Sequence, residues 1–296
     1  MTLSSHALSA RRLLTTLAIS SLPASDCSSV ISALGANWLG AQRLASLTWW
    51  RCRQVNLPES VQYDLHCAYY AAVGDAELHR RELAHVLRQL NSRQIRAVVF
   101  KGAALAYSIY PDPACRTMGD IDLWVAAEDI ERARQALSEV GYESFRKPDR
   151  PPALMALFQG EIGLQHSYSE YGLVELHWGV FAGVWLRRIA TIDVEAVRRR
   201  IVPTQLTGEA AHVLAPEDAV LQSALHTAVN HQMSMSALRG LVDIALLARR
   251  YSLDWDVIVQ RARMWRVATA VWLVLSLAVD LAGLDEAAGA ERQLRP

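Results

Sequence analysis

Two neighbouring stretches decide how this chain folds: Lys101-Gly102-Ala103-Ala104, and Arg116-Thr117-Met118-Gly119-Asp120-Ile121-Asp122-Leu123-Trp124-Val125. A short apolar run, residues 97–100, precedes the small-residue turn, and an Asp-x-Asp pair opens a second apolar strand. Side chains two residues apart on a strand point to the same face, so Asp120 and Asp122 direct two carboxylates at one point. The apolar residues between and after them then face a core.

Two carboxylates held together repel each other unless a positive charge lies between them. A hard divalent cation with oxygen ligands, most naturally Mg²⁺, fits this position. Lys101 and Arg116 lie close by in the sequence, and a metal beside two cationic side chains indicates a phosphate-bearing ligand. The alternative for Asp120 and Asp122 is a structural pair at the strand entrance near Gly119.

The composition bounds the class of protein. The chain has 296 residues, is 52% hydrophobic and carries a formal net charge of +0. A length of this order supports one large domain or two modest ones. The neutral charge argues against general nucleic-acid binding, which needs clustered positive charge. The four cysteines form no C-x-x-C pair, which predicts reduced thiols in a cytoplasmic protein.

No segment is predicted to interact with a membrane. The apolar run 267–279 is shorter than the ~20 residues that a membrane span needs, and Asp280 follows it at once. Near the N-terminus, Arg11-Arg12 precedes a short apolar stretch that two threonines interrupt. This pattern favours an amphipathic helix over a signal peptide.

The order of elements predicts an α+β fold, with a small mixed sheet flanked by helical segments on both sides. We expect an N-terminal helical region over 1–95, an αβ core over 96–205 and a C-terminal helical domain over 206–296. In the core, helices are expected at 103–109 and 128–140, and strands at 97–100, 121–126, 162–168 and 173–178. From about residue 190 the chain is expected to be helical, with Asp254 capping a long helix that runs towards Leu281.

The combination of these elements resembles the nucleotidyltransferase superfamily, which has a polymerase-β-like fold. More narrowly, it is similar to a bacterial nucleotidyltransferase family with the pattern KGaal…YpdpxxR…DiDlLV…(D/E)lHW. The matching residues here are Lys101–Leu105, Tyr110–Pro113, Arg116, Asp120–Val125 and Glu175–Trp178. The match extends weakly into the C-terminal helices through His226, His231, Leu238, Arg239, Asp243 and Asp254-Trp255.

The resemblance implies a two-metal site for phosphoryl transfer. Asp120, Asp122 and Glu175 would be the catalytic carboxylates and would hold two Mg²⁺ ions, or Mn²⁺ in their place. Glu175 is one methylene longer than the aspartate more common at the third position. The nucleoside triphosphate (NTP), with ATP among the candidates, would contact a phosphate-binding set that consists of Lys101, Gly102, Ala103 and Arg116. The superfamily's usual Gly-Ser is Gly102-Ala103 here.

Several of these side chains have a second interpretation. Glu175 could be an ordinary exposed strand residue, and Lys101 and Arg116 could form structural ion pairs. His177 either orients a metal ligand or is a structural histidine. Trp124 could stack on a base, but core packing is the favoured interpretation. His226 and His231, five apart on an expected helix, have a poor spacing for one metal and are expected to make packing contacts.

The leading hypothesis is a metal-dependent enzyme that moves a nucleoside monophosphate from an NTP to a hydroxyl or similar acceptor, releasing pyrophosphate. The acceptor would be a small molecule or a modified peptide. One alternative is toxin-like transfer to tRNA or protein, and another is a non-catalytic nucleotide-binding or helical interaction module. NTP preference and oligomeric state stay open. Replacing Asp120 or Asp122 by Asn is expected to stop transfer, keep the fold and relieve carboxylate repulsion.

Overall fold

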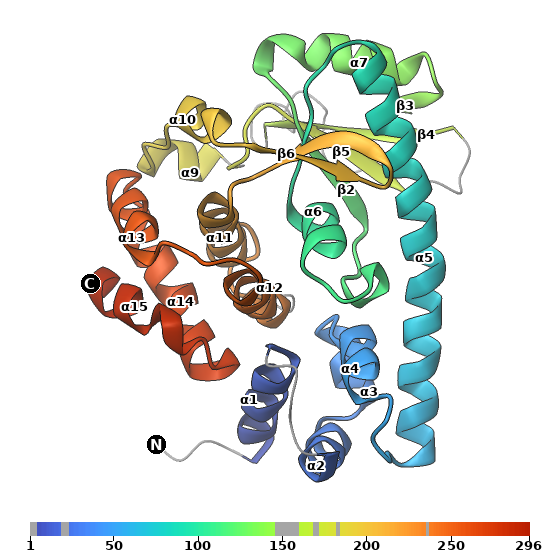
Figure 1. Cartoon of the computed structure of the whole chain (residues 1–296), viewed down its shortest axis with the longest axis vertical. Helices are drawn as coiled ribbons and strands as arrows, with labels where there is room; N and C mark the ends of the chain where they lie inside the picture. Colours follow the sequence, from blue (N-terminus) through green and yellow to red (C-terminus); the bar gives the residue numbers. More distant parts are fainter. Residues whose placement is uncertain (1–4, 19–23, 146–159, 168–171, 182–183, 235–236) are drawn as a thin grey trace.

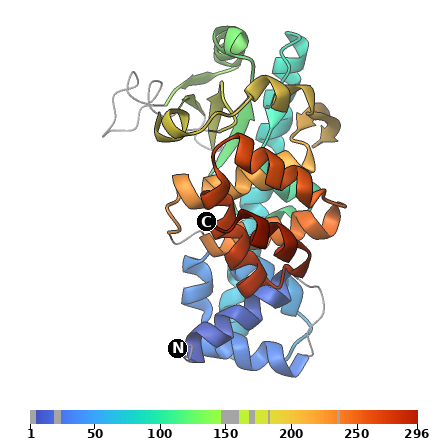
Figure 2. The same ribbon diagram turned by 90° about the vertical axis from the view of Figure 1, so that its left-hand side faces the viewer.

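The computed structural model describes residues 5–18, 24–145, 160–167, 172–181, 184–234 and 237–296. One mixed β-sheet lies at one end of the molecule, and helices from both ends of the chain fill the other end (Figures 1 and 2). The expected α+β class is confirmed. Among the described residues, the helices are too short or too polar to cross a membrane.

Within the described residues, the sheet contains seven strands in the order β3-β4-β5-β2-β1-β7-β6. Two pairs are parallel, β2 with β5 and β1 with β7, and the remaining neighbours are antiparallel. The strands are β1 (Val98–Val99), β2 (Asp120–Trp124), β3 (Tyr142–Ser144), β4 (Glu161–His166), β5 (Leu173–His177), β6 (Val202–Leu206) and β7 (Glu209–Val213).

One face of the sheet is the apolar core predicted from the alternation in β2. Ile121 and Leu123 are fully buried there, together with Leu176 of β5. This face is covered by the second half of α5 (Glu59–Ser92) and by α7 (Ile130–Ser138), which contribute Leu87 and Leu137 to the same cluster (Figure 1). Because successive side chains of a strand alternate between faces, Asp120 and Asp122 lie on the opposite face.

The helices that fill the other end of the molecule come from the two ends of the chain. The N-terminal group consists of α1 (Ser5–Ala18), α2 (Ala24–Leu34), α3 (Ala36–Ala41) and α4 (Ala45–Cys52). After β5, α9 (Val184–Ile189) and α10 (Val194–Arg199) lead to β6. The C-terminal group consists of α11 (Pro216–Leu225), the π-helical turn η3 (His226–Asn230), α12 (Ala237–Arg250), α13 (Trp255–Met264), α14 (Ala268–Ala282) and α15 (Ala288–Leu294).

The N-terminal and C-terminal helices share one hydrophobic core. Helix α1 packs against α12 and α14, and Figure 1 shows these helices side by side although they lie more than 200 residues apart. At the edge of this contact, Thr15 Oγ1 donates a hydrogen bond to the Leu281 carbonyl at 3.3 Å, and Arg11 forms an ion pair with Asp280 at 3.5 Å. The two ends of the chain therefore form one packed layer.

The structure differs from the expected elements at two places. Residues 202–213, in the segment expected to be helical, form the hairpin β6–β7, whose turn holds Thr207 and Gly208 at positive φ angles of 54° and 90°. Two residues with positive φ fit the tight turn that joins antiparallel strands. Because β7 pairs with β1, the sheet extends past the expected domain boundary at 205; the division into three domains remains a proposal.

The long helix expected after Asp254 is also divided in two. Asp254 does cap its start, since its side chain accepts a hydrogen bond from the Val257 amide at 3.1 Å. The helix ends at Met264, however, and Arg266 has a left-handed φ of 58° before α14 begins at Ala268. Left-handed backbone cannot continue a right-handed helix, so the apolar periodicity of 254–281 belongs to two helices.

Close packing of α12 against η3 at Gly240 gives a stability prediction. A Cβ atom at position 240 would collide with the buried hydroxyl of Thr227. Gly240→Ala should therefore lower the free energy of unfolding by about 1–3 kcal/mol, against the usual benefit of alanine in a helix. Urea denaturation measures this difference.

The control is Gly289→Ala in α15, where an added Cβ meets open space and stability should stay level or rise. The double variant Gly240→Ala/Thr227→Ala should recover much of the loss, because the colliding hydroxyl is gone. A Gly240→Ala protein as stable as wild type would contradict the packing described here.

Candidate active site

The acidic residues predicted from the sequence meet on the polar face of the sheet. Asp120 and Asp122 lie on β2, and in the parallel pair β2–β5 the residue beside Asp122 is Glu175. Asp122 and Glu175 are buried, with exposed fractions of 2% and 6%, so the interpretation of Glu175 as an exposed strand residue is wrong. A fourth carboxylate, Glu161 of β4, lies opposite His177 of β5. No motif in the sequence points to Glu161 as a site residue.

Asp122 is the centre of a hydrogen-bond network. One of its oxygens, Oδ1, accepts bonds from Lys101 Nζ at 2.6 Å and pairs with His177 Nε2 at 2.8 Å. The other ring nitrogen of His177, Nδ1, lies 3.4 Å from a Glu161 oxygen. Burial alone would raise the pKa of Asp122, but the Lys101 ammonium and the His177 contact hold that pKa well below its usual range. Asp122 is therefore a stable carboxylate.

The other two predicted carboxylates experience the opposite balance. Burial, followed by repulsion from Glu161, Asp122 and Asp120, raises the pKa of Glu175 to about 8. Burial and the neighbouring Asp122 likewise raise the pKa of Asp120. Neutralising the side chain of Asp120 or Glu175 is therefore expected to relieve repulsion between the carboxylates. For Asp122, replacement by Asn would instead leave Lys101 without its partner, so the effect of that replacement stays a prediction.

Lys101 begins α6 (Lys101–Ser108) in an uncommon backbone conformation. Its φ is 52°, in the left-handed region that non-glycine residues rarely adopt, and its side chain is mostly buried. Strain of this kind persists where the surrounding structure fixes it and often occurs at functional sites. Here the ion pair with Asp122 fixes the side chain. The structure therefore shows the carboxylate pairing that was one of two interpretations of Lys101.

The turn after Lys101 is closely covered. A Cβ at Gly102 would lie 3.2 Å from Met118 Cβ and 3.7 Å from Arg116 Nη1. These neighbours leave little room for any side chain at position 102. Ala103 is fully buried in the apolar core of the sheet. Its side chain therefore does not reach the cleft, and only its backbone amide can contribute to a site.

Arg116 forms a buried, two-pronged ion pair with Asp243 of α12. Its Nε and Nη2 donate to the two carboxylate oxygens at 2.8 and 2.9 Å, and Tyr110 donates its hydroxyl to the same carboxylate at 2.5 Å. The third nitrogen, Nη1, donates to the Thr117 carbonyl at 3.0 Å. Arg116 thus anchors α12 to the loop before β2, the structural ion pair that was one of its two interpretations.

The four carboxylates, together with Lys101, Gly102 and Arg116, line a cleft of about 430 Å³ between the sheet and the helices. The carboxylates and Lys101 form one wall. The opposite wall was not predicted as part of the site and comes from the two helical groups: Arg43, His226, Asn230, His231 and Arg239. Trp124, in contrast, is 1% exposed and packs in the core, as expected.

The two histidines of this wall are brought together by a π-helical turn. In η3 the His231 amide donates to the His226 carbonyl at 2.9 Å, an i+5 to i bond. Residues five apart then share a face, and the two rings lie 4.3 Å apart in an edge-to-face contact. Burial, followed by nearby Lys101, lowers the pKa of His226 to about 2, so its ring is neutral. Such turns often occur at functional sites.

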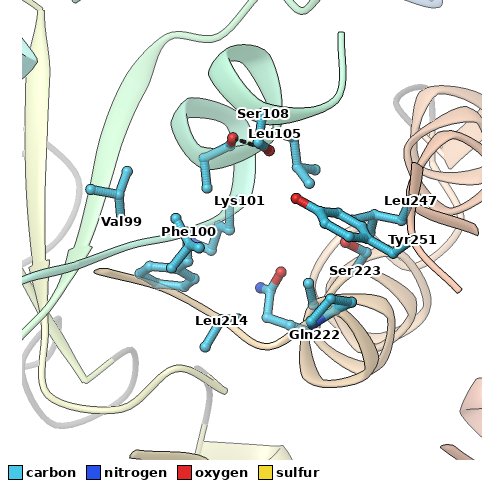
Figure 3. Close-up of a pocket in the computed structure, with 14 residues that line it drawn as sticks. Val99, Phe100, Lys101, Leu105, Ser108, Leu214, Gln222, Ser223, Leu247 and Tyr251 are labelled. Atoms are coloured by element: carbon cyan, nitrogen blue, oxygen red, sulfur yellow. Dashed lines mark hydrogen bonds between the residues drawn. The ribbon is translucent and has the colours of Figure 1, made fainter. Parts of the chain in front are cut away.

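A second, narrower cavity lies next to Lys101, between α6 and the helices α11 and α12 (Figure 3). Phe100, Leu214 and Tyr251 form its apolar walls, and Gln222 and Ser223 supply polar groups. Its volume is about 30 Å³, which suits one or two water molecules. The larger cleft is therefore the candidate site for a substrate.

The acidic wall fits a divalent cation. Ligand atoms of Asp122, Glu175 and His177 all lie within 4.8 Å of one another. Carboxylate oxygens are the donors that Mg²⁺ prefers, whereas imidazole is not. Because His177 Nε2 already contacts Asp122, the imidazole is better placed to orient that carboxylate than to bind the ion. The remaining carboxylate, Asp120, lines the same cleft.

Comparison with known proteins identifies a family for the chain. A family model described as "Uncharacterised nucleotidyltransferase" matches residues 35–283. No curated protein matches the chain.

Three solved structures are similar at low sequence identity. An antigenic nucleotidyltransferase-like protein from Paracoccidioides brasiliensis is 15% identical with a TM-score of 0.46, over 72% of this chain and 92% of that chain. The lincomycin-bound lincosamide antibiotic adenylyltransferase LnuA is 12% identical with a TM-score of 0.37, over 58% and 97%. The antibiotic-resistance factor ANT(2'')-Ia is 11% identical with a TM-score of 0.41, over 64% and 90%. At TM-scores this low, these similarities do not bear on function.

The raised pKa of Glu175 predicts how stability changes with pH. Because the folded state binds the proton more tightly than the unfolded state, the contribution of Glu175 is full below pH 4.5 and is lost as the pH rises to about 8. Without divalent ions, wild type should lose stability relative to Glu175→Gln across this window, by a difference on the order of 4 kcal/mol.

Urea denaturation of both proteins in EDTA at several pH values measures this difference. Glu82, whose pKa burial raises to about 7, affects both proteins alike and cancels. Glu143→Gln, at an exposed site on β3, is the matched control and should follow wild type. A stability difference that does not change with pH would contradict the description of Glu175 as a buried, repelled carboxylate.

Proposed function

The chain belongs to the family described as uncharacterised nucleotidyltransferases, and we propose that it transfers a nucleoside monophosphate from an NTP to a hydroxyl or similar acceptor. In this reaction the acceptor oxygen forms a bond to the α-phosphorus, the bond to the β-phosphate oxygen breaks, and pyrophosphate leaves. The observation that carries the proposal is the set of buried carboxylates on β2 and β5, which face a cleft with cations on its other wall.

Asp120, Asp122 and Glu175 are proposed to hold two Mg²⁺ ions. Metal ions in such sites stabilise the attacking and leaving oxygens of an in-line displacement. The carboxylate set supports this role because burial, followed by repulsion between the carboxylates, raises the pKa values of Asp120 and Glu175, so a cation is the natural compensation. His177 would keep Asp122 in one orientation through its 2.8 Å contact.

The start of α6 is proposed to bind the phosphates of the NTP. Backbone amides at the N-terminus of a helix favour anions, and Gly102 and Ala103 supply such amides. Lys101 would add a positive charge at the point where the phosphates approach the carboxylates. Arg116 would contribute through Nη1, the one guanidinium nitrogen that is not bonded to Asp243.

The acceptor is proposed to be a small molecule or a modified peptide. A cleft of about 430 Å³ lies within the usual range of small-molecule sites. The formal net charge of +0 does not favour tRNA, which is the toxin-like alternative. A second candidate function, nucleotide binding without turnover, is favoured by the Lys101–Asp122 ion pair, because a bound metal must compete with the ammonium for that carboxylate.

Thermal-shift measurements with ATP, GTP, CTP and UTP, each with and without Mg²⁺, test the nucleotide site. At least one NTP should raise the melting temperature of wild type in a metal-dependent manner, since any ligand of the folded state stabilises it. Asp120→Asn should lose this shift. Asp120 is chosen because Asp122 also holds Lys101 and His177 in place.

The matched control is Asp285→Asn, at an exposed aspartate away from the cleft, which should keep the full shift. A metal-dependent shift that persists unchanged in Asp120→Asn would overturn the assignment of the carboxylates. Pyrophosphate release with an acceptor pool then separates transfer from binding alone, because the non-catalytic module would show the shift without release.

A further inference from the structure

Arg239 is a buried cation without a carboxylate of its own. The residue is 7% exposed, and its Nη1 donates to the Thr117 carbonyl at 2.8 Å. Within the described ranges it forms no ion pair, because Asp243, one turn along α12, is already bonded at both oxygens to Arg116. Two buried guanidinium groups therefore share one carboxylate, and this part of the molecule carries an excess positive charge.

An excess charge of this kind is costly unless something compensates it. Burial, followed by the nearby Arg116, lowers the pKa of Arg239 to about 10, so the side chain is still protonated at neutral pH. The groups around it on the cleft wall are His226, His231, Asn230 and Arg43, none of which is negative. A buried charge is normally paired. Since Arg239 lines the cleft, an anionic ligand would supply the missing partner.

The position of Arg239 indicates which anion. Arg239 Nη1 and Arg116 Nη1 both donate to the Thr117 carbonyl, at 2.8 and 3.0 Å, so the two guanidinium groups are adjacent. Arg116 Nη1 in turn lies 3.7 Å from where a Cβ of Gly102 would be. Arg116 therefore lies between Arg239 and the Gly102 turn, and all three residues line the same cleft. A phosphate chain that passes this turn next reaches Arg239.

We propose that Arg239, with Arg43 beside it, binds the terminal phosphates of the NTP and holds the pyrophosphate as it leaves. This inference rests on the proposed function, and it adds a role for α12: the helix distinguishes a triphosphate from a monophosphate. A planar guanidinium suits this role because it binds phosphate oxygens in two-pronged geometry. Arg43, from the loop between α3 and α4, brings the N-terminal helices to the same ligand.

A phosphate or carboxylate on the acceptor would present similar chemistry to Arg239. The terminal phosphates are favoured because Arg239 adjoins Arg116 and the Gly102 turn, where the NTP is expected. The two sources differ in a measurable way. If the anion belongs to the NTP, the preference for NTP over the corresponding monophosphate depends on Arg239 without any acceptor present.

The experiment compares wild type, Arg239→Gln, Arg239→Lys and Arg249→Gln by isothermal titration calorimetry with Mg²⁺. Arg249 is exposed near the end of the same helix and is the matched control. The ligands are each NTP that binds wild type, its monophosphate, and inorganic tripolyphosphate, which contains no base. Melting temperatures without ligand report on folding.

Arg239→Gln should weaken NTP and tripolyphosphate binding by about tenfold or more, the size expected for losing charge-assisted bonds to phosphate, and should leave monophosphate affinity within about twofold. Arg239→Lys keeps the charge and should recover part of the loss. Arg249→Gln should match wild type. The unliganded melting temperature of Arg239→Gln should not fall, because the variant removes an uncompensated buried charge.

An unchanged ratio of NTP to monophosphate affinity in Arg239→Gln would overturn the inference and leave the proposed function intact. If Arg239→Gln keeps the wild-type ratio of NTP to monophosphate affinity but melts at a lower temperature, Arg239 only supports the Thr117 loop, and the inference is also overturned. An equal loss of NTP and monophosphate affinity would also overturn it. If wild type binds no NTP, the proposed function fails first and the inference with it.

Discussion

The rest of this site depends on the buried carboxylate of Asp122 and its contacts with Lys101 and His177. Asp122 is only 2% exposed, so its negative charge must be compensated, and Lys101 and His177 supply that compensation from two other segments. Lys101 adopts a left-handed backbone conformation as it does so, which sets the direction in which α6 begins. His177, the last residue of β5, in turn lies 3.4 Å from Glu161 through its Nδ1 atom. The arrangement of the acidic wall follows from the need to satisfy this single group.

A second buried ion pair organises the opposite wall. Arg116 and Asp243 connect the loop before β2 to α12, which places Arg239 and the His226–His231 pair across from the carboxylates. The cleft therefore has walls of opposite charge, each built from segments distant in sequence. Such a charge distribution can compensate metal ions on one side and phosphates on the other. This property requires the Arg116–Asp243 ion pair, which holds the basic wall opposite the acidic one.

The sequence predicted the sheet face and the acidic wall, since strand alternation and the Asp-x-Asp pair depend on neighbouring residues alone. Glu175 followed from the resemblance. Glu161 did not, because it precedes the strand expected at 162–168, and its place opposite His177 depends on the register of the β4–β5 pair. Arg43 and Arg239 reach the cleft only through packing of helices that are nearly 200 residues apart. The meeting of His226 and His231 required a π-helical turn, which apolar periodicity does not reveal. The assignments of the site residues remain predictions.

The packing of α1 on α12 and α14 brings the N-terminal helices into contact with the C-terminal helices, so the two helical groups are joined both by this contact and through the sheet. Helix α5, whose 34 residues span about 50 Å, connects the N-terminal helices to the sheet, and β7 connects the sheet to the C-terminal helices. A hinge at either connection would have to bend α5 or separate α1 from α14. Substrates should therefore enter a cleft of nearly fixed width, with adjustment confined to side chains and loops. Selectivity would then come from shape set during folding rather than from closure around the ligand.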